Sequence, residues 1–278
     1  MHRHEHFDLW LDDDETLAAL LGKPVVERTT LHGWPLSCVQ LVRLADGSRH
    51  VYKTHAEPTV EPDFYLRARA PLLVPARLIP HEGRLPALLL EHLDAPTLAD
   101  LGLDEPAAVR AVEAVLAAIG RIEGELPAVA DISTEASWLA FAAEVLEDAR
   151  LLRGAGRLPG VGQAEEDAIR RAAESRAVLD AVVAEPGYVN TDLKAAHVFG
   201  LPDGHRVVDW QRPIRGPVAL DRATLLRELG VDPRRHVSEG VLRLMDLHRL
   251  AWWASARRRP GSPRPHDAEI ARLAGRLA

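Results

Sequence analysis

The order of local patterns along the chain constrains its fold more than any single motif. Strand-like patterns fill the first third, and helical patterns fill most of the remainder. Three β-branched or alternating runs come first, at residues 24–33, 36–47 and 48–55. Asp46-Gly47 between the last two is a strong hairpin signal, and two more strands are expected within residues 77–93. Because strands and helices are segregated, the sequence predicts an α+β fold and not alternating βαβ units.

Apolar residues at three-and-four spacing predict one helix among the strands and several after them. The expected helices cover residues 61–73, 104–126, 135–152, 164–184 and 238–259. Asp104 is a possible N-cap of the second helix, and Pro106 suits its first turn. A short connector near residues 91–96 divides the two regions. We therefore expect an N-terminal β-rich lobe of residues 1–93 and a helical C-terminal lobe of residues 94–278.

Charge and cysteine content narrow the class of protein. The formal net charge of the 278 residues is −7, which argues against a nucleic-acid partner, and the basic stretch 257–265 is expected to be a solvated connection. A single cysteine, Cys38, excludes an internal disulfide framework and favours a reducing cytoplasm. No apolar run approaches the roughly 18 residues that span a membrane, and the first residues lack the apolar core of a secretory signal. We expect a cytoplasmic protein without a membrane partner, and its oligomeric state stays open.

One predicted hairpin carries the most informative side chains. Residues 187–210 read GYVNTDLKAAHVFGLPDGHRVVDW, with a turn predicted at residues 202–204. Four polar side chains lie close in sequence around this turn: Asp192, Lys194, His197 and Asp209. A hairpin places its flanks side by side, so the two carboxylates are expected to face a common point. One or two carboxylates plus substrate phosphates commonly hold Mg²⁺.

This segment resembles the catalytic segment of aminoglycoside phosphotransferases and their relatives, in which an H-G-D-x-x-x-x-N stretch precedes a hairpin ending in I-D-W. The resemblance implies a bilobal protein kinase-like fold, with an antiparallel N-terminal sheet and a larger helical lobe. It assigns Asp192 as the catalytic aspartate that orients the substrate hydroxyl. It assigns Asp209 as the metal-binding aspartate, and Lys194 as a lysine that steadies the γ-phosphate.

Two positions depart from the family pattern. Asn190 stands where the family has a structural histidine, and its side chain could still hydrogen-bond. His197 stands where the family has a metal-binding asparagine. Imidazole suits Zn²⁺ or Mn²⁺ better than Mg²⁺. The site is therefore expected to keep one full Mg²⁺ position, to prefer another metal such as Mn²⁺, or to be impaired.

Further motifs of the family follow in the expected order. Lys53 ends the third strand, where the family has the lysine that grips the nucleotide phosphates. Glu61 opens E-P-D-F-Y, which matches the helix whose glutamate pairs with that lysine. Residues 31–37 match the phosphate-covering loop between the first two strands, which makes Gly33 and Ser37 candidate nucleotide contacts.

Two later segments complete the resemblance. LLLEHLDAPTL is similar to the linker between the lobes, where backbone groups near Glu91, His92 and Leu93 are expected to bind the adenine edge. GPVALDRATLL resembles the segment after the metal aspartate, and it places Asp221 as a brace of the catalytic loop.

These patterns predict an O-phosphotransferase that uses ATP (or GTP) with Mg²⁺ or Mn²⁺. The acceptor is expected to be a small hydroxylated compound, such as an aminoglycoside or other antibiotic, a sugar, a nucleoside or an amino alcohol. An antibiotic acceptor would imply a role in antibiotic resistance. The alternative is a kinase-fold protein that has lost catalysis and binds a nucleotide or a partner as a regulatory module. In the simplest reading, Asp192 and Asp209 only cap turns and Lys53 is a solvated strand lysine.

Overall fold

The computed structural model describes residues 1–158, 161–258 and 266–277. The chain forms two compact units, and each is assembled from separate segments of sequence. The first contains Met1–Gly102, Arg121–Val129 and Lys194–Pro213, and the second contains Leu103–Gly120, Ala130–Leu193 and Ile214–Ala278. The sequence predicted a division after residue 93. The units differ from that division mainly because residues 194–213 pack with the first unit.

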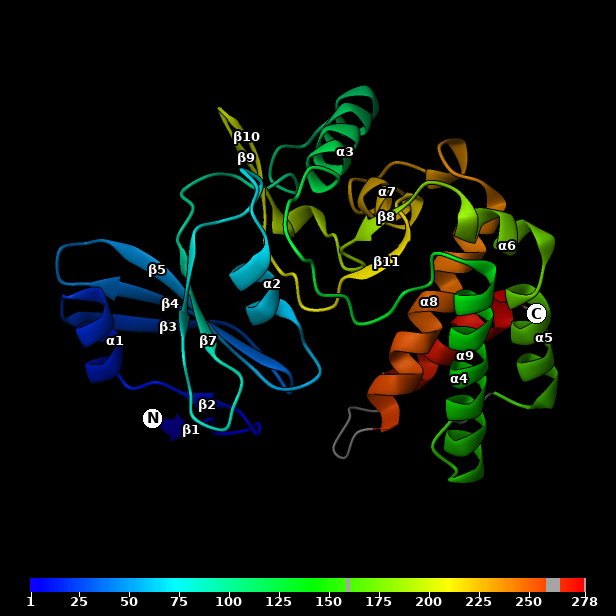
Figure 1. The fold of residues 1–278 in the computed structure, drawn as a ribbon, viewed down its shortest axis with the longest axis horizontal. Helices are drawn as coiled ribbons and strands as arrows, with labels where there is room; N and C mark the ends of the chain where they lie inside the picture. Colours follow the sequence, from blue (N-terminus) through cyan, green and yellow to red (C-terminus); the bar gives the residue numbers. More distant parts are fainter. Residues whose placement is uncertain (159–160, 259–265, 278) are drawn as a thin grey trace. The chain divides into compact units, whose positions relative to one another are not determined.

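The first unit is built on a five-stranded antiparallel sheet in the order β3-β4-β5-β7-β6 (Figure 1). Its strands are β3 (Val25–Trp34), β4 (Ser37–Leu44), β5 (Arg49–His55), β6 (Ala76–Ile79) and β7 (Ala87–Glu91). The five strands that the sequence predicted are confirmed. The Leu44 N–H donates to the Ser48 carbonyl, and the Leu44 carbonyl accepts the Gly47 N–H. These two bonds close the predicted β4–β5 hairpin around Asp46-Gly47.

Short elements surround this sheet. They are β1 (His2–Arg3), β2 (Trp10–Leu11), α1 (Asp14–Leu21) and α2 (Glu61–Arg67). β1, β2 and α1 were not predicted from the sequence, and α2 was expected to extend to residue 73. The helix ends earlier because Ala68 is extended, with a ψ of 144°. Pro71 also disfavours a helical conformation for the residue before it.

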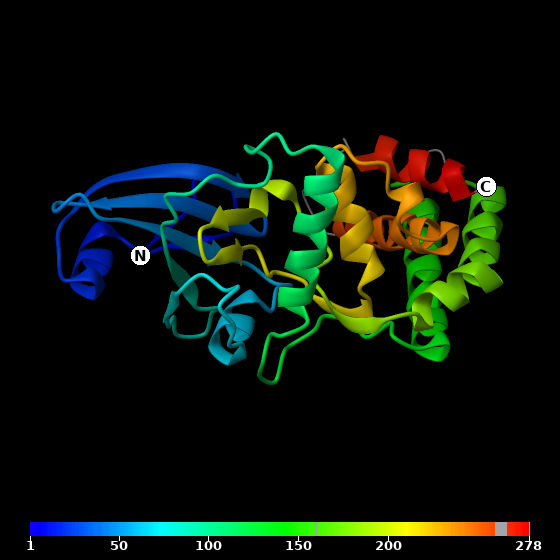
Figure 2. The same cartoon turned by 90° about the horizontal axis from the view of Figure 1, so that it is seen from above.

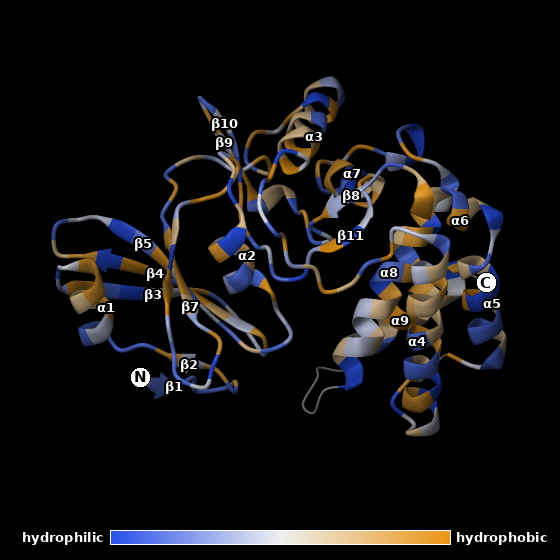
Figure 3. Cartoon of the chain, in the orientation of Figure 1, coloured by the Kyte–Doolittle hydropathy of each residue, from blue (hydrophilic) through white to orange (hydrophobic). Residues whose placement is uncertain are grey.

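The two faces of the sheet bury different clusters. Leu17 of α1, Tyr52 and Leu89 belong to the cluster on one face. Leu88 and Leu90 belong to a second cluster, to which Tyr65 of α2 adds its ring. Successive side chains of a strand point to opposite faces of the sheet. Tyr52 of β5 therefore points into the first cluster, and Lys53 points to the face that α2 covers. The apolar residues of β7 contribute to both clusters, and hydrophobic residues are coloured orange in Figure 3.

The predicted catalytic hairpin follows a short 3-10 helix, η1 (Ala195–His197). It consists of β9 (Val198–Leu201) and β10 (Gly204–Val207), with Leu201 opposite Gly204. The turn at residues 202–204 is thus confirmed. β10 ends at Val207, so Asp209 lies beyond the strand that the sequence extended to residue 210.

The second unit is mainly helical (Figure 2). Its helices are α3 (Glu105–Ile119), α4 (Glu135–Gly154), α5 (Gln163–Ala173), α6 (Arg176–Val183), α7 (Ala219–Glu228), η2 (Pro233–Arg235), α8 (Glu239–Arg258) and α9 (His266–Leu277). Two strands pair antiparallel beside them, β8 (Pro186–Val189) and β11 (Ile214–Pro217). Asp104 caps α3 by accepting the Ala107 N–H, as predicted.

One predicted helix of this unit is in fact two. Residues 164–184 were expected to form a single helix, but α5 ends at Ala173 and α6 begins at Arg176. Ser175 is extended, and its hydroxyl donates to the Ala172 carbonyl, which ends the first helix. Serine competes in this way with the helical backbone, and the apolar spacing alone did not reveal the break.

Two remaining expectations concern the chain as a whole. Among the described residues, every helix is too short or too polar to cross a membrane. The basic stretch 257–265, expected as a solvated connection, lies outside the described residues except for its first two positions.

Candidate active site

Strand β5 and helix α2 supply the first half of the candidate site. Lys53 and His55 are two residues apart in β5 and therefore share the face of the sheet that α2 covers. Glu61 is the first residue of α2, and Pro62 occupies the first turn, where a missing N–H costs nothing. The Glu61 N–H donates to the Thr59 hydroxyl at 3.2 Å. The strand and the start of the helix therefore hold these side chains close together.

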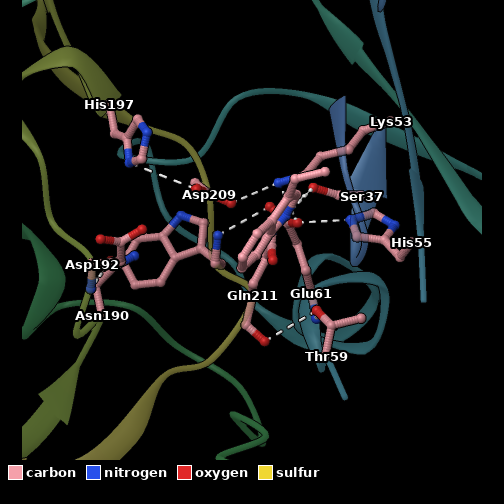
Figure 4. A network of polar contacts seen from close by, with 12 residues as sticks. Ser37, Lys53, His55, Thr59, Glu61, Asn190, Asp192, His197, Asp209 and Gln211 are labelled. Atoms are coloured by element: carbon pink, nitrogen blue, oxygen red, sulfur yellow. Dashed lines mark hydrogen bonds and ion pairs between the residues drawn. The ribbon is translucent and has the colours of Figure 1, made fainter. Parts of the chain in front are cut away.

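The predicted pair of Lys53 and Glu61 forms. Lys53 Nζ lies 2.6 Å from Glu61 Oε2 and 2.7 Å from Asp209 Oδ1 (Figure 4). The side chains of Lys53 and Glu61 are 7% and 1% exposed, so both charges are shielded from water. A buried ion pair is favourable only with good geometry and further hydrogen bonds, and this network supplies both. The structure thus brings three sequence-predicted residues to one place.

The three charges determine one another's protonation. Burial acts to lower the pKa of Lys53, but the carboxylates of Asp209 and Glu61 outweigh it and leave that pKa raised. Burial acts to raise the pKa of Glu61, and the Lys53 ammonium outweighs it, so the pKa is lowered. The pKa of Asp209 is lowered against burial in the same way, by Lys53 and then His197. The lysine therefore stays charged and both carboxylates stay ionised.

Residues 209–211 are fastened to the start of α2. Glu61 Oε1 accepts the Trp210 N–H at 3.0 Å, so one carboxylate binds Lys53 and the backbone beside Asp209. The Gln211 carbonyl accepts from the Val60 N–H and the Thr59 hydroxyl, each at 3.0 Å.

Two further features fix the conformation of this segment. The Trp210 ring stacks on Phe64 of α2, with centroids 4.6 Å apart. Asp209 has a φ of 69°, a left-handed conformation that is uncommon for a residue other than glycine. The surrounding contacts hold it there, as is typical of functional sites.

His55 was not identified from the sequence, yet it is a member of this network. Its Nε2 lies 2.8 Å from Glu61 Oε2, and its side chain is fully buried. Burial lowers the pKa of His55 more than Glu61 raises it, so the ring is neutral and Nε2–H donates to the carboxylate. Its Nδ1 is buried with no hydrogen-bond partner among the described residues. A lone buried acceptor costs about 1–3 kcal/mol, so simple packing does not account for a histidine here.

His197 lies beside Asp209, as the resemblance implied. Its carbonyl accepts the Val208 N–H at 3.0 Å, which ties η1 to the residue before Asp209. The ring Nδ1 lies 3.7 Å from Asp209 Oδ2, which is too long for a hydrogen bond. Two ligand atoms at this separation can both reach one divalent cation at about 2.1 Å, so the donor pair fits a metal ion. Lys194 opens this segment, and its charge also lowers the pKa of Asp209.

The segment that the resemblance matches to a phosphate-covering loop, residues 31–37, forms the tip of the β3–β4 hairpin. The strands run almost as predicted, because β3 extends to Trp34 and β4 starts at Ser37. Gly33 therefore pairs with Cys38 inside the ladder. Trp34 Nε1–H donates to the Ser37 hydroxyl at 3.1 Å, which shortens the connection to a tight turn. Ser37 also accepts from Gln211 Nε2 at 3.4 Å, so this hairpin contacts the segment that carries Asp209.

The predicted adenine-binding linker begins where the sheet ends. Glu91 is the last residue of β7 and pairs with His50 of β5. His92 follows without regular structure, and burial, followed by the charge of Arg49, lowers its pKa. Leu93 packs against the second sheet cluster. Their role toward a nucleotide remains a prediction.

The loop of the predicted catalytic aspartate belongs to the second unit. Asn190 and Thr191 directly follow β8, and Asp192 comes next. Asp221 in the first turn of α7 accepts the Asn190 N–H at 2.6 Å and the Thr191 N–H at 2.9 Å. Asp221 therefore braces this loop, as the resemblance implied. Burial raises the pKa of Asp221 to about 7, although both N–H donors oppose it.

Two details of the loop orient Asp192. Thr191 has a φ of 70°, which is strained for a β-branched residue and turns the chain sharply before Asp192. Asn190 is 2% exposed, and its Oδ1 accepts the Asp192 N–H at 3.1 Å. Asparagine therefore still forms a hydrogen bond at the position where the family has histidine.

Solved structures of other proteins identify the fold of this chain. No protein-family model and no curated protein sequence matches the chain. A solved structure of a thermostable mutant of aminoglycoside phosphotransferase APH(4)-Ia, in its apo form, aligns with a TM-score of 0.64 at 14% identity, over 95% of this chain and 98% of that chain. A ternary complex of such a mutant with ADP and hygromycin B aligns with a TM-score of 0.60 at 12% identity, over 95% and 97%. Choline kinase LicA from Streptococcus pneumoniae aligns with a TM-score of 0.63 at 14% identity, over 95% and 96%.

The chain therefore has the kinase-like fold of the aminoglycoside phosphotransferases and choline kinases. An antiparallel N-terminal sheet precedes a mainly helical C-terminal region, as the sequence predicted. At identities of 12–14% the likeness establishes the fold.

Proposed function

We propose that the protein is a small-molecule O-phosphotransferase that transfers the γ-phosphate of ATP (or GTP) to a hydroxyl group. The observation that carries the proposal is the buried network of Lys53, Glu61 and Asp209 in a kinase-like fold. A lysine on the third sheet strand paired with a glutamate on the helix that follows this strand, here α2, is the arrangement with which kinases hold nucleotide phosphates. The ADP in one similar structure supports a nucleotide as donor.

In the proposed reaction the acceptor hydroxyl oxygen attacks the γ-phosphorus. The new O–P bond forms as the bond to the β–γ bridging oxygen breaks, and the nucleoside diphosphate leaves. Asp192 orients the hydroxyl and takes up its proton, while Lys53 offsets charge on the phosphate oxygens. Asp209 and His197 would hold a divalent cation, Mg²⁺ or Mn²⁺, which offsets phosphate charge when bound. Most of the rate gain then comes from positioning and electrostatics.

The acceptor is proposed to be a small hydroxylated compound. Hygromycin B is the second ligand of one similar structure, and choline kinase is another similar protein. Both support an aminoglycoside, a sugar, a nucleoside or an amino alcohol as the class to screen. Specificity resides in side chains that the fold alone does not determine.

A thermal-melt comparison with and without nucleotide tests the donor site first. A nucleotide present at 100 times its dissociation constant stabilises by about 2.7 kcal/mol, which for a chain of this size raises the melting temperature by roughly 5–10 °C. We expect this increase with Mg-ATP or Mn-ATP and its loss in Asp209→Asn. An unchanged melting temperature with either metal, for ATP and for GTP, contradicts the proposal.

One observation favours a second candidate function, a nucleotide-binding or partner-binding module without catalysis. His197 stands where the resemblance expects a metal-binding asparagine, and its Nδ1 lies 3.7 Å from Asp209. The two candidates differ in turnover. Nucleotide binding without release of diphosphate across a panel of hydroxylated acceptors supports the module, and phosphorylation of any acceptor excludes it.

A further inference from the structure

We propose that Gln211 is a positioning residue that fastens the β3–β4 hairpin to the segment carrying Asp209, through the hydroxyl group of Ser37. The proposal rests on the proposed function, because that function makes the hairpin a cover for nucleotide phosphates and Asp209 a metal ligand. The resemblance assigned no role to Gln211, and it assigned Ser37 as a nucleotide contact. Here Ser37 acts instead as the point where two parts of the first unit meet.

Ser37 lies on the face of the sheet that carries the candidate site. It pairs with His55 across β4 and β5, and Val39 pairs with Lys53. Residues directly opposite each other in antiparallel strands share a face, so Ser37 points to the same side as His55. Cys38 points to the other face and belongs to the cluster on the α1 side. Ser37 is 1% exposed, so its hydroxyl group bonds with protein groups rather than with water.

The Ser37 hydroxyl group accepts hydrogen bonds from two side chains. Trp34 Nε1–H donates at 3.1 Å from across the hairpin turn, and Gln211 Nε2–H donates at 3.4 Å from the Asp209 segment (Figure 4). A hydroxyl oxygen has two acceptor lone pairs, and these two donors use both of them. The tip of the hairpin and the Asp209 segment therefore meet at one oxygen atom.

The backbone of Gln211 is itself held in place. Its carbonyl accepts from the Val60 N–H and the Thr59 hydroxyl, each at 3.0 Å. Asp209 lies two residues earlier, in a left-handed conformation with a φ of 69°. The Gln211 side chain thus extends from a fixed backbone beside the candidate metal ligand, and it binds the hairpin through Ser37.

A hairpin that is already fixed lowers the cost of binding a nucleotide. If the tip were mobile, it would have to be ordered when it covered phosphates, and that ordering would subtract from the affinity. The bond between Gln211 and Ser37 provides part of this order in advance. It also fixes the position of the tip relative to the segment that carries Asp209. Loss of the bond should therefore weaken nucleotide binding.

The test removes the two partners singly and together. Gln211→Met keeps the length of the side chain without its donor, Ser37→Ala removes the acceptor, and the double variant lacks both. Ser37→Thr is the conservative variant, because it keeps a hydroxyl group. Gln40→Met is the matched control, since Gln40 also lies in β4 but bonds Arg28 and Thr30. Calorimetry gives the dissociation constant of Mg-ATP for each variant, and thermal melts establish that each is folded.

We expect Gln211→Met to raise the dissociation constant of Mg-ATP about fivefold, the effect of losing one hydrogen bond between neutral groups. The double variant should bind Mg-ATP like Ser37→Ala alone, because the second change removes a bond that is already lost. Ser37→Thr should stay within about twofold of the wild type. Gln40→Met should lower the melting temperature without weakening Mg-ATP binding.

Three results would overturn the role of Gln211. They are equal Mg-ATP binding by Gln211→Met and the wild type, an equal loss in Gln40→Met, and additive losses in the double variant. Additive losses would mean that Gln211 acts on the nucleotide without Ser37, for example by contact with the metal ion. If Ser37→Ala does not fold, Ser37→Cys replaces it, because a thiol is only a weak acceptor. A wild type that binds neither ATP nor GTP, with either metal, overturns the proposed function instead.

Discussion

Lys53 Nζ lies 2.7 Å from Asp209 Oδ1, although 156 residues of sequence separate them. The same nitrogen binds Glu61, so one ammonium group balances two carboxylates where little water has access. One side chain of β5 therefore binds both the first residue of α2 and Asp209, in addition to the contacts of Trp210 and Gln211 with the start of α2. This arrangement is stable only while the lysine is present or another cation takes its place.

Replacing Lys53 by methionine should destabilise the fold by about 3 kcal/mol at neutral pH, because two carboxylates then face each other without a cation. Lys53 lowers the pKa of Glu61 and of Asp209, so its contribution is present above the unfolded-state pKa values and disappears as pH falls through the folded-state values. Urea unfolding of the variant and the wild type at several pH values measures both effects. Lys23→Met, which removes an exposed pair with Asp46, is the control and should change stability by less than about 0.5 kcal/mol. Equal urea midpoints for Lys53→Met and the wild type would contradict the expectation.

Asp192→Asn should abolish turnover and leave nucleotide binding nearly intact. The amide cannot take up the hydroxyl proton, and positioned bases contribute about 10²- to 10⁴-fold to rate. The Asp192 N–H bond to Asn190 uses the backbone and survives the change. Initial rates and nucleotide titrations on the same preparation provide the measurement. Asp203→Asn at the hairpin turn, where the side chain pairs only with Arg206 among the contacts described, serves as control. Turnover within tenfold of the wild type would show that the base has been assigned to the wrong residue.

His197→Asn restores the residue that the family pattern has at this position. Imidazole favours Mn²⁺ over Mg²⁺ relative to an amide oxygen, so the variant should show a higher ratio of Mg²⁺-supported to Mn²⁺-supported activity. The same ratio measured for His205→Asn, on the neighbouring strand β10, is the control. An unchanged ratio in His197→Asn would mean that the ring does not contact the metal.

The sequence predicted those parts of the fold that local patterns determine. Five sheet strands, the start of α3 at its Asp104 cap and the β9–β10 turn follow from alternation, capping and turn chemistry over a few residues. The pairing of Lys53 with Glu61 was predicted because both residues lie within recognisable motifs at short separation.

Contacts that depend on packing were not predictable in the same way. His55 resembles any strand histidine in sequence, and its role depends on the position of Glu61 in the folded protein. The bond from Gln211 to Ser37 joins segments 174 residues apart, so no local pattern indicates it. Trp34 Nε1–H donates to the Ser37 hydroxyl across the β3–β4 turn, which is a contact between two side chains. Sequence periodicity does not encode such bonds.

Asp221→Asn should remove a dependence of stability on pH that the wild type possesses. Burial raises the pKa of Asp221 from 3.8 to about 7, so the folded state binds a proton more tightly than the unfolded state does. Stability from this group is complete below about pH 4 and decreases as pH rises to about 7, by as much as about 4 kcal/mol. The unfolding free energy of the variant minus that of the wild type should therefore increase between pH 4 and pH 7. Glu113→Gln, which loses only a partly exposed pair with Arg222, is the control and should follow the wild type in this range. A difference that stays constant with pH would show that Asp221 is ionised throughout, held so by the N–H groups of Asn190 and Thr191.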